Sequence, residues 1–293
     1  MNPLLLQSAN GTAFFVGIGL AVCGLVFREW AERRILRSAL TIAAVLGAAF
    51  AAMSATPQPI WAYAIWFVLF MAVLLCPATP GGKPFLTNRR FSTIRRATLA
   101  MLIVASVGLC AAELPYHLAP AIAASSERPV YVIGDSLSAG LTESERTWPK
   151  MLGDLSGLKV INLARPGATL KSGLDEARRV TDGGALVIVE LGGNDLLANT
   201  DSRTFKRQLD GLLGAVRRSN VRVAMFELPL PPLYNAFGAA QRTLAAKHGV
   251  TLIPKRYLTA ALGCKGGTID GLHLSEHGHR TLAEAISGIL ERE

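Results

Sequence analysis

Four long apolar runs in the first part of the chain constrain the fold more than any other feature of the sequence. They cover residues 4–27, 39–55, 60–76 and 97–112, and none of them contains Lys, Arg, Asp or Glu. A helix needs about 20 mainly apolar residues to cross the hydrocarbon core of a bilayer. The sequence therefore predicts about four transmembrane helices within residues 1–112. The run at 39–55 is short and rich in alanine, so it also fits a buried or tilted segment.

Two other interpretations of these runs are less favourable. Apolar helices also form the cores of large soluble domains, but here charged segments follow the first and the third of these charge-free runs. A cleaved signal peptide begins with a basic segment, which the N-terminus lacks, and three further apolar runs follow the first. We therefore expect residues 1–112 to form a membrane region.

The net charge of +9 would fit a nucleic-acid-binding protein, but its distribution points to a membrane topology instead. From Ser125 onward basic and acidic residues nearly balance. Under the positive-inside rule, basic segments between membrane helices stay in the cytoplasm. The N-terminus and everything after residue 112 then lie outside, on the periplasmic face of a bacterial inner membrane. We expect a lipid bilayer as a partner and no nucleic acid. The basic residues before Ser125 all lie in two segments between apolar runs: Arg28, Arg33, Arg34, Arg37, Lys83, Arg89, Arg90, Arg95 and Arg96.

Residues 129–293 have the pattern of an α/β domain, joined to the membrane region by a linker at 113–128 that mixes Pro, Ala and Ser. Strands almost continuous in Val, Ile and Leu indicate a parallel sheet buried on both faces. Their alternation with helical segments predicts a three-layer α/β/α fold, in which ligands bind at the carboxyl ends of the strands. The expected strands are 130–133, 159–164, 185–191, 221–228 and 250–254, and the expected helices are 147–155, 171–181, 202–219, 235–248 and 276–290.

Small and polar residues gather where the first three strands end and before the last helix. They read GDSLSAG at 134–140, ARPG at 164–167, VELGGND at 189–195 and DGLHLSEHGH at 270–279. Each block alone fits an ordinary turn or helix start. Together, in this order, they resemble the SGNH (GDSL-type) hydrolase superfamily over about residues 129–291, and in detail its acyl-thioesterase, lysophospholipase and arylesterase branch. The resemblance implies a flavodoxin-like domain with a five-stranded parallel sheet. The membrane helices are no part of that family's pattern.

The residue types match the chemistry of ester cleavage by a serine. Ser136 is the expected nucleophile, His273 the base that takes its proton, and Asp270 the acid that holds the imidazole in the productive tautomer. The resemblance implies an oxyanion hole made of the backbone N–H groups of Ser136 and Gly167 and the side-chain amide of Asn194. Ser136 is also expected to open a helix, whose N-terminus favours negative charge.

The other polar residues near these blocks have simpler explanations. Asp135 is expected to be a turn acid, since it adjoins the nucleophile. Ser138 and Ser275 are expected to be structural. His277 and His279 are expected to cap the last helix or to be solvated. Because there is no cluster of acids or cysteines around them, we predict no metal site and no cofactor.

The sequence thus predicts a membrane-anchored serine esterase that cleaves carboxylic or thioesters, such as lysophospholipids and acyl or aryl esters, at the extracytoplasmic face. The apolar segments 228–237 and 257–269 are expected to shape its pockets. An alternative is an envelope O-acyltransferase or deacetylase that uses the same triad on a glycan or lipid. A non-catalytic envelope scaffold is less favoured, because such a protein would be expected to have lost part of the catalytic set.

Overall fold

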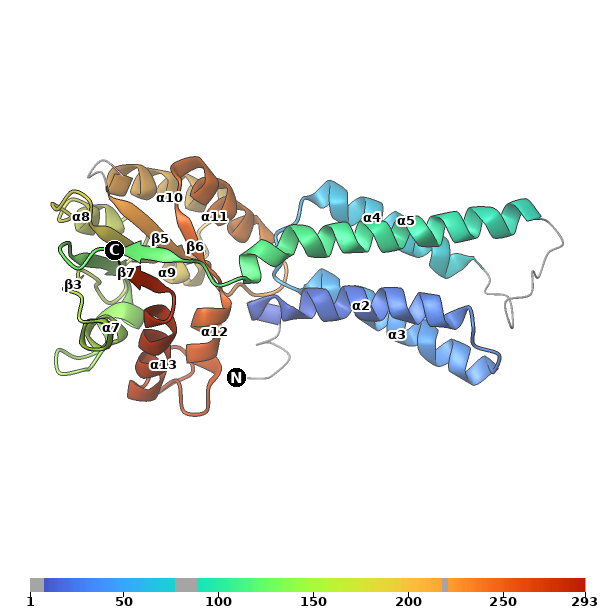
Figure 1. The fold of residues 1–293 in the computed structure, drawn as a ribbon, viewed down its shortest axis with the longest axis horizontal. Helices are drawn as coiled ribbons and strands as arrows, with labels where there is room; N and C mark the ends of the chain where they lie inside the picture. Colours follow the sequence, from blue (N-terminus) through green and yellow to red (C-terminus); the bar gives the residue numbers. More distant parts are fainter. Residues whose placement is uncertain (1–7, 77–88, 218–220, 293) are drawn as a thin grey trace. The chain divides into compact units, whose positions relative to one another are not determined.

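The computed structural model describes residues 8–76, 89–217 and 221–292. The chain divides into two compact units, shown in Figure 1. The helical unit comprises Gly11–Pro115, and the α/β unit comprises Tyr116–Glu293 together with Met1–Asn10. Each unit is described by itself below.

The described residues of the helical unit form four apolar helices. They are α2 (Thr12–Arg28), α3 (Arg34–Met53), α4 (Ile60–Leu75) and α5 (Arg89–Glu113). Two segments, Arg34–Met53 and Thr93–His117, are long and apolar enough to cross a membrane by length and composition. Helices α2 and α4 are shorter, with 17 and 16 residues. The first residues of the expected span 4–27 lie outside the described residues.

Helices α2 and α3 approach each other closely at two glycines. A Cβ atom on Gly17 would lie 2.4 Å from the backbone nitrogen of Ala51, and one on Gly47 would lie 2.6 Å from that of Ala21. Only a hydrogen atom fits at either position. Close packing through small residues is typical of helix pairs in membranes, where van der Waals contact replaces the hydrophobic effect as the main attraction.

Polar contacts define the two ends of the helical unit. At one end the Arg28 guanidinium donates to the carbonyls of Val73 (2.7 Å) and Leu74 (3.0 Å), which end α4. Glu29 forms an ion pair with Arg95 near the start of α5 at this same end. The other end is marked by a hydrogen bond of 3.1 Å from Gln58 to Glu113. The end of α2, the end of α4 and Arg95 of α5 therefore lie at one end of the unit.

The α/β unit is built on a parallel sheet with the strand order β3-β2-β4-β5-β6. This confirms the expected five-stranded parallel sheet, and the order is that of flavodoxin-like folds. The strands are short, and β4 at the centre is buried along its whole length. Their bounds are β2 Val130–Gly134, β3 Val160–Asn162, β4 Leu186–Glu190, β5 Arg222–Phe226 and β6 Thr251–Ile253.

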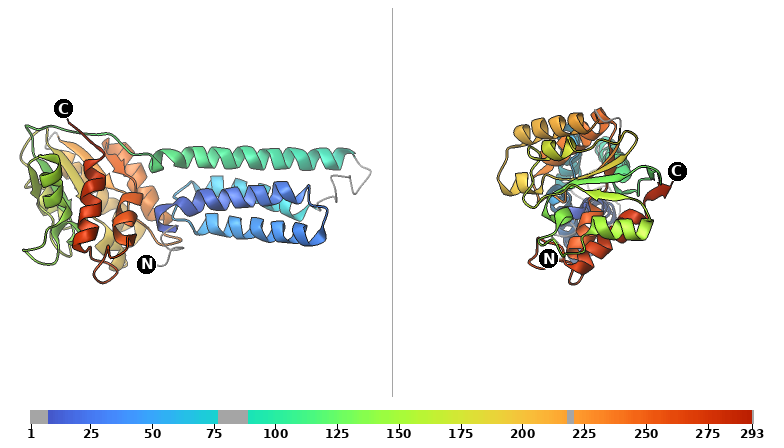
Figure 2. Two further views of the ribbon diagram at one scale, coloured as in Figure 1. Left: turned by 60° about the horizontal axis from the view of Figure 1, so that its bottom comes forward. Right: turned by 90° about the vertical axis from the view of Figure 1, so that its left-hand side faces the viewer.

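Helices cover both faces of this sheet, as Figures 1 and 2 show. Helices α7 (Trp148–Ser156), α12 (Arg256–Gly263) and α13 (Glu276–Ser287) share a buried core with alternate residues of the strands. The unit also contains α8 (Gly173–Ala177), α10 (Ser202–Arg217) and α11 (Asn235–His248), besides two short helices described with the site. Helix α8 is shorter than expected, and α12 occupies part of the apolar segment 257–269, where no helix was expected.

The segment 113–128 differs from the irregular linker that the sequence indicates. It contains a 3-10 helix, η2 (Leu114–His117), and a strand, β1 (Ile122–Ala124). Strand β1 pairs in parallel with β7 (Leu290–Arg292) at the end of the chain. Ile122 and Ala124 are buried, so burial of two apolar side chains helps to hold a strand that is too short to recognise from periodicity.

Candidate active site

Ser136 stands where β2 ends and the short helix α6 (Ser136–Ala139) begins. The Oδ1 atom of Asp135 accepts the backbone N–H of Leu137 at 2.9 Å and so caps this helix. Gly134 allows the tight turn, because a Cβ atom there would lie 2.6 Å from Ser138 Oγ. Ser136 is half-buried. Helix α6 has a single turn, so it offers little of the helix dipole that the sequence analysis invoked.

Gly167 occupies a tight turn after β3. The turn is closed by a hydrogen bond of 3.1 Å from the N–H of Ala168 to the carbonyl of Arg165. Pro166 and Gly167 hold its two central positions, and Gly167 has a φ of 75°, which is the pattern of a type II turn. The N–H of Gly167 has no acceptor among the described residues. It is therefore free to donate to a ligand.

The side chain of Asn194 links these two turns. Asn194 lies in α9 (Gly193–Leu197), which follows β4. Its Nδ2 donates to the carbonyl of Ala168 at 3.0 Å and to Oδ2 of Asp135 at 3.2 Å. The structure thus brings the three expected oxyanion-hole elements together at the carboxyl edge of the sheet. Both amide hydrogens of Asn194 are engaged in this arrangement.

His273 and Asp270 lie on the loop before α13 and contact each other. His273 Nδ1 lies 2.7 Å from Asp270 Oδ2. Asp270 Oδ1 accepts the N–H groups of His273 (2.8 Å) and Leu272 (2.9 Å). The hydrogen bond from the His273 side chain, followed by those from the two backbone groups, holds the pKa of Asp270 well below its usual range. A carboxylate at Nδ1 leaves Nε2 unprotonated and able to act as a base.

His273 also acts on the turn that carries Ser136. Burial raises the pKa of Asp135, whereas the backbone N–H of Leu137, the hydrogen bond with Glu190 and the charge of His273 lower it. Within the described residues no hydrogen bond joins Ser136 Oγ to His273 Nε2. Such contacts in ligand-free sites are often long and tighten only with substrate.

Glu190 is a buried acid at this site that the sequence analysis did not single out. It ends β4, is 1% exposed, and accepts a hydrogen bond of 2.8 Å from Ser138 Oγ. Ser138 Oγ in turn accepts the indole N–H of Trp148 at 3.1 Å. Ser138 is therefore buried, with its hydroxyl hydrogen-bonded between Glu190 and Trp148. The signal in the sequence was an acid that closes an otherwise apolar buried strand.

The histidines of the last helix differ from each other. His277 is exposed, whereas His279 is buried, so the expectation that both cap the helix or are solvated was wrong for His279. The Nδ1 of His279 accepts the backbone N–H of Trp148 at 3.2 Å, and its Nε2 lies 3.0 Å from Glu145. Ser275 caps α13 by accepting the N–H of Gly278. No cluster of three or more His, Cys, Asp and Glu side chains suited to a metal ion occurs in the described parts of the chain.

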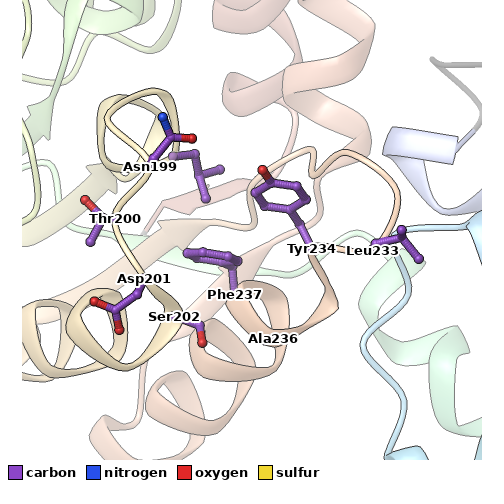
Figure 3. A pocket seen from close by; sticks show the side chains of 9 residues that line it. Asn199, Thr200, Asp201, Ser202, Leu233, Tyr234, Ala236 and Phe237 are labelled. Atoms are coloured by element: carbon purple, nitrogen blue, oxygen red, sulfur yellow. The ribbon is translucent and has the colours of Figure 1, made fainter.

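A cavity of about 310 Å³ adjoins α9, the helix that carries Asn194 (Figure 3). The expected pocket segment 228–237 contributes to it, whereas the segment 257–269 contributes none of its lining residues. The stretch after α9, which the sequence analysis missed, supplies the other wall. Leu233 and Asn199, one from each wall, have positive φ angles of 72° and 54°. The lining residues are Leu196, Asn199, Thr200, Asp201, Ser202, Leu233, Tyr234, Ala236 and Phe237.

Comparison with known proteins agrees with this geometry. The model of the GDSL-like Lipase/Acylhydrolase family matches residues 132–281. An arylesterase of Vibrio mimicus is 28% identical over 178 residues, which are 56% of this chain and 89% of that protein. Thioesterase 1/protease 1/lysophospholipase L1 of Escherichia coli strain K12 is 29% identical over 178 residues, 57% of this chain and 86% of that protein. A crystal structure of TesA matches with a TM-score of 0.50 and 26% identity, covering 55% of this chain and 97% of that chain.

The family match lies wholly within the α/β unit and includes Ser136, Gly167, Asn194, Asp270 and His273. The relatives named above are esterases and thioesterases. The chain therefore belongs to the GDSL-like lipase/acylhydrolase family, and it is a hydrolase of the SGNH type.

Proposed function

We propose that the protein is a membrane-anchored serine esterase. Two sets of contacts among the expected catalytic residues support this proposal, and the charge of His273 lowers the pKa of Asp135, which adjoins Ser136. The His273–Asp270 pair forms the first set, and the Asn194 amide, which bridges the turns of Ser136 and Gly167, forms the second.

The proposed reaction has two steps. Ser136 Oγ attacks the ester carbonyl while His273 Nε2 takes its proton, and the alcohol or thiol leaves with that proton. Water then attacks the acyl-enzyme with His273 again as the base, which releases the acid and restores Ser136. The N–H groups of Ser136, Gly167 and Asn194 stabilise the negative oxygen in both steps.

The apolar surroundings favour esters with an acyl chain or an aryl group. Tyr234 and Phe237, whose rings stack with centroids 5.5 Å apart, line the cavity next to α9. Leu197 is exposed at the end of α9, which carries Asn194, and Ile269 and Leu272 are exposed on the loop that carries His273. Aliphatic and aromatic surfaces of this kind suit an acyl chain better than a bare sugar.

We also propose that α2, α3, α4 and α5 anchor the chain in a membrane, with the α/β unit on the extracytoplasmic side. Arg28 and Arg95 lie at the same end of the helical unit, as the contacts of Arg28 with α4 and of Arg95 with Glu29 require. This is the end that the positive-inside rule would keep in the cytoplasm. Lipid-derived and envelope-bound esters would then be within reach of the site.

The test is hydrolysis of p-nitrophenyl esters, from acetate to long acyl chains, by the full chain in detergent. Serine-dependent turnover requires that Ser136→Ala abolish activity, while Ser144→Ala, which changes an exposed hydroxyl, retains it. Turnover by Ser136→Ala equal to that of the unaltered protein would refute the mechanism. Release of p-nitrophenol only when a sugar or lipid alcohol is added would replace hydrolysis with acyl transfer.

A further inference from the structure

Two acidic side chains lie on the core side of the nucleophile turn, and the proposed reaction uses neither. Asp135 is 4% exposed and Glu190 is 1% exposed. Glu190 Oε2 accepts hydrogen bonds from Ser138 Oγ (2.8 Å) and from the backbone N–H of Asp135 (3.4 Å). The two carboxyl groups also act on each other electrostatically, because the charge of Asp135 raises the pKa of Glu190. Burial of two acidic side chains next to each other is energetically unfavourable unless both are hydrogen-bonded or one is neutral.

Two ionised carboxylates in contact away from water repel each other, so such a pair holds one proton between them. Burial, and then the charge of Asp135, raise the pKa of Glu190 well above its usual value. Burial also raises the pKa of Asp135, but the N–H of Leu137, the hydrogen bond with Glu190 and the charge of His273 counter it. The proton therefore resides on Glu190, and Asp135 is the anionic member.

The anionic member reaches the oxyanion hole. Asp135 Oδ1 caps α6, and its Oδ2 accepts one N–H of Asn194. The other N–H of Asn194 points to the carbonyl of Ala168, which directly follows Gly167. With one hydrogen held by Asp135, the amide keeps its nitrogen turned toward the crevice, and the second hydrogen can move from Ala168 to a negative oxygen near Gly167.

We propose that Asp135, with the buried Glu190 as its partner, is a positioning residue that orients the Asn194 amide toward the oxyanion. The chain of contacts runs from Trp148 through Ser138 to Glu190, and from there to Asp135 and Asn194. This inference rests on the proposed esterase function. It assigns a role to the acid of the Gly-Asp-Ser turn and to an acid that ends β4.

A double-mutant cycle between Asp135→Asn and Asn194→Ala in the full chain tests the proposal. The substrate is a short, water-soluble p-nitrophenyl ester. Asn194→Ala is expected to lower kcat by roughly 10²–10³, the usual effect of losing one oxyanion donor. In Asp135→Asn an N–H₂ group replaces one of the two oxygens that accept the N–H groups of Leu137 and Asn194, so the two contacts cannot both persist. The variant is expected to lower kcat by about tenfold or more, with KM changed by less than about threefold. The double variant is expected to be no slower than Asn194→Ala.

Glu190 provides a second measurement that does not depend on altering Asp135. Glu190→Gln keeps one donor and one acceptor and is expected to retain kcat within about threefold, whereas Glu190→Leu lowers it. In the Asn194→Ala background Glu190→Leu is expected to have no further effect on kcat. Glu227→Gln is the matched control, since Glu227 is a buried acid that follows β5 and pairs with Arg242. It is expected to lower thermal stability while leaving kcat unchanged.

The outcomes separate this inference from the function on which it rests. If Ser136-dependent turnover is present but the losses of Asp135→Asn and Asn194→Ala multiply, the two residues act independently and the inference is wrong. An unchanged kcat in Asp135→Asn would also overturn it. If the unaltered protein shows no Ser136-dependent turnover, the proposed function fails, and this inference fails with it.

Discussion

His273 and Asp270 are joined twice, once through the imidazole Nδ1 (2.7 Å) and once through the backbone N–H of His273 (2.8 Å). One carboxylate therefore holds both the ring and the peptide to which the ring belongs. The loop is closed on itself by a further hydrogen bond from the N–H of Ile269 to the carbonyl of His273. The histidine can be oriented in this way without help from a distant part of the chain.

Replacing Asp270 by Asn should lower kcat/KM by about 10²–10⁴ with little change in folding. An asparagine can turn its N–H₂ group toward Nδ1, which places the proton on Nε2 and removes the base. Steady-state kinetics on a p-nitrophenyl ester would measure the loss. Asp175→Asn is the control, because Asp175 is also exposed and pairs with an arginine three residues away. Equal activity of both variants would show that another acid orients His273.

Gly167→Ala should reduce kcat by about tenfold. A Cβ atom there meets nothing within 4 Å, so the effect comes from the φ of 75°, which disfavours alanine by roughly 1 kcal/mol. The strain shifts the N–H that we propose donates to the oxyanion. Gly157 is a matched control, because it has a similar φ of 68° and a Cβ atom there would also meet nothing within 4 Å. It lies directly after α7. Gly157→Ala should cost similar stability and leave kcat intact. A loss of kcat in both variants would point to a general effect of strain.

Ala236→Phe should shorten the preferred acyl chain. The larger side chain fills part of the cavity and leaves no room for about two methylene groups of a long acyl chain. The lost binding free energy is about 1.6 kcal/mol, which lowers kcat/KM for a long-chain ester more than tenfold. Turnover of the acetate ester should not change. Ala246→Phe, on the exposed face of the same helix, serves as the control. If the two variants share the chain-length profile of the unaltered protein, the cavity does not hold the acyl chain.

The buried His279 should make the α/β unit less stable in acid. Burial lowers the pKa of His279, an effect that Glu145 only partly offsets. As the pH falls below about 6.5, the unfolded chain therefore binds a proton that the folded chain resists, and the free energy of unfolding decreases. His279→Gln keeps an acceptor for Trp148 and a donor for Glu145. Denaturant unfolding of this variant should show a smaller decrease between about pH 7.5 and pH 5.

His277→Gln is the control for this pH dependence, because His277 is exposed on the same helix. It should retain the decrease seen in the unaltered protein. A decrease that is the same in His279→Gln would assign the acid sensitivity to other groups.

Gly17→Leu should disrupt the pairing of α2 and α3, since its Cβ atom alone would lie 2.4 Å from the backbone of Ala51. Overpacking of this kind costs about 1–3 kcal/mol or more, which should lower the melting temperature of the detergent-solubilised chain by several degrees. Gly19→Leu adds the same side chain to α2 where nothing lies within 4 Å. Equal melting temperatures for the two variants would argue against the close approach.

The sequence alone determined the architecture of the sheet. Buried parallel strands require runs of Val, Ile and Leu, and the run at 185–191 predicted β4 within one residue at each end. The sequence also predicted that the motif blocks lie at strand ends, because each apolar run stops where its small and polar residues begin. Local patterns were informative wherever the physical cause was local. The turn at Gly167 is such a case, since Pro166 and Gly167 specify their own backbone angles.

Only the tertiary structure decided which polar groups meet. The strand β1 exists because Ile122 and Ala124 pair with the far end of the chain, and His279 is buried because folding brings it against Trp148. Likewise, Glu190 lies against Asp135 only because β2 and β4 are neighbours in the sheet. No repeating pattern in the sequence indicates such contacts. Burial, hydrogen-bond partners and shared protons depend on the groups that folding brings together, and these come from distant segments.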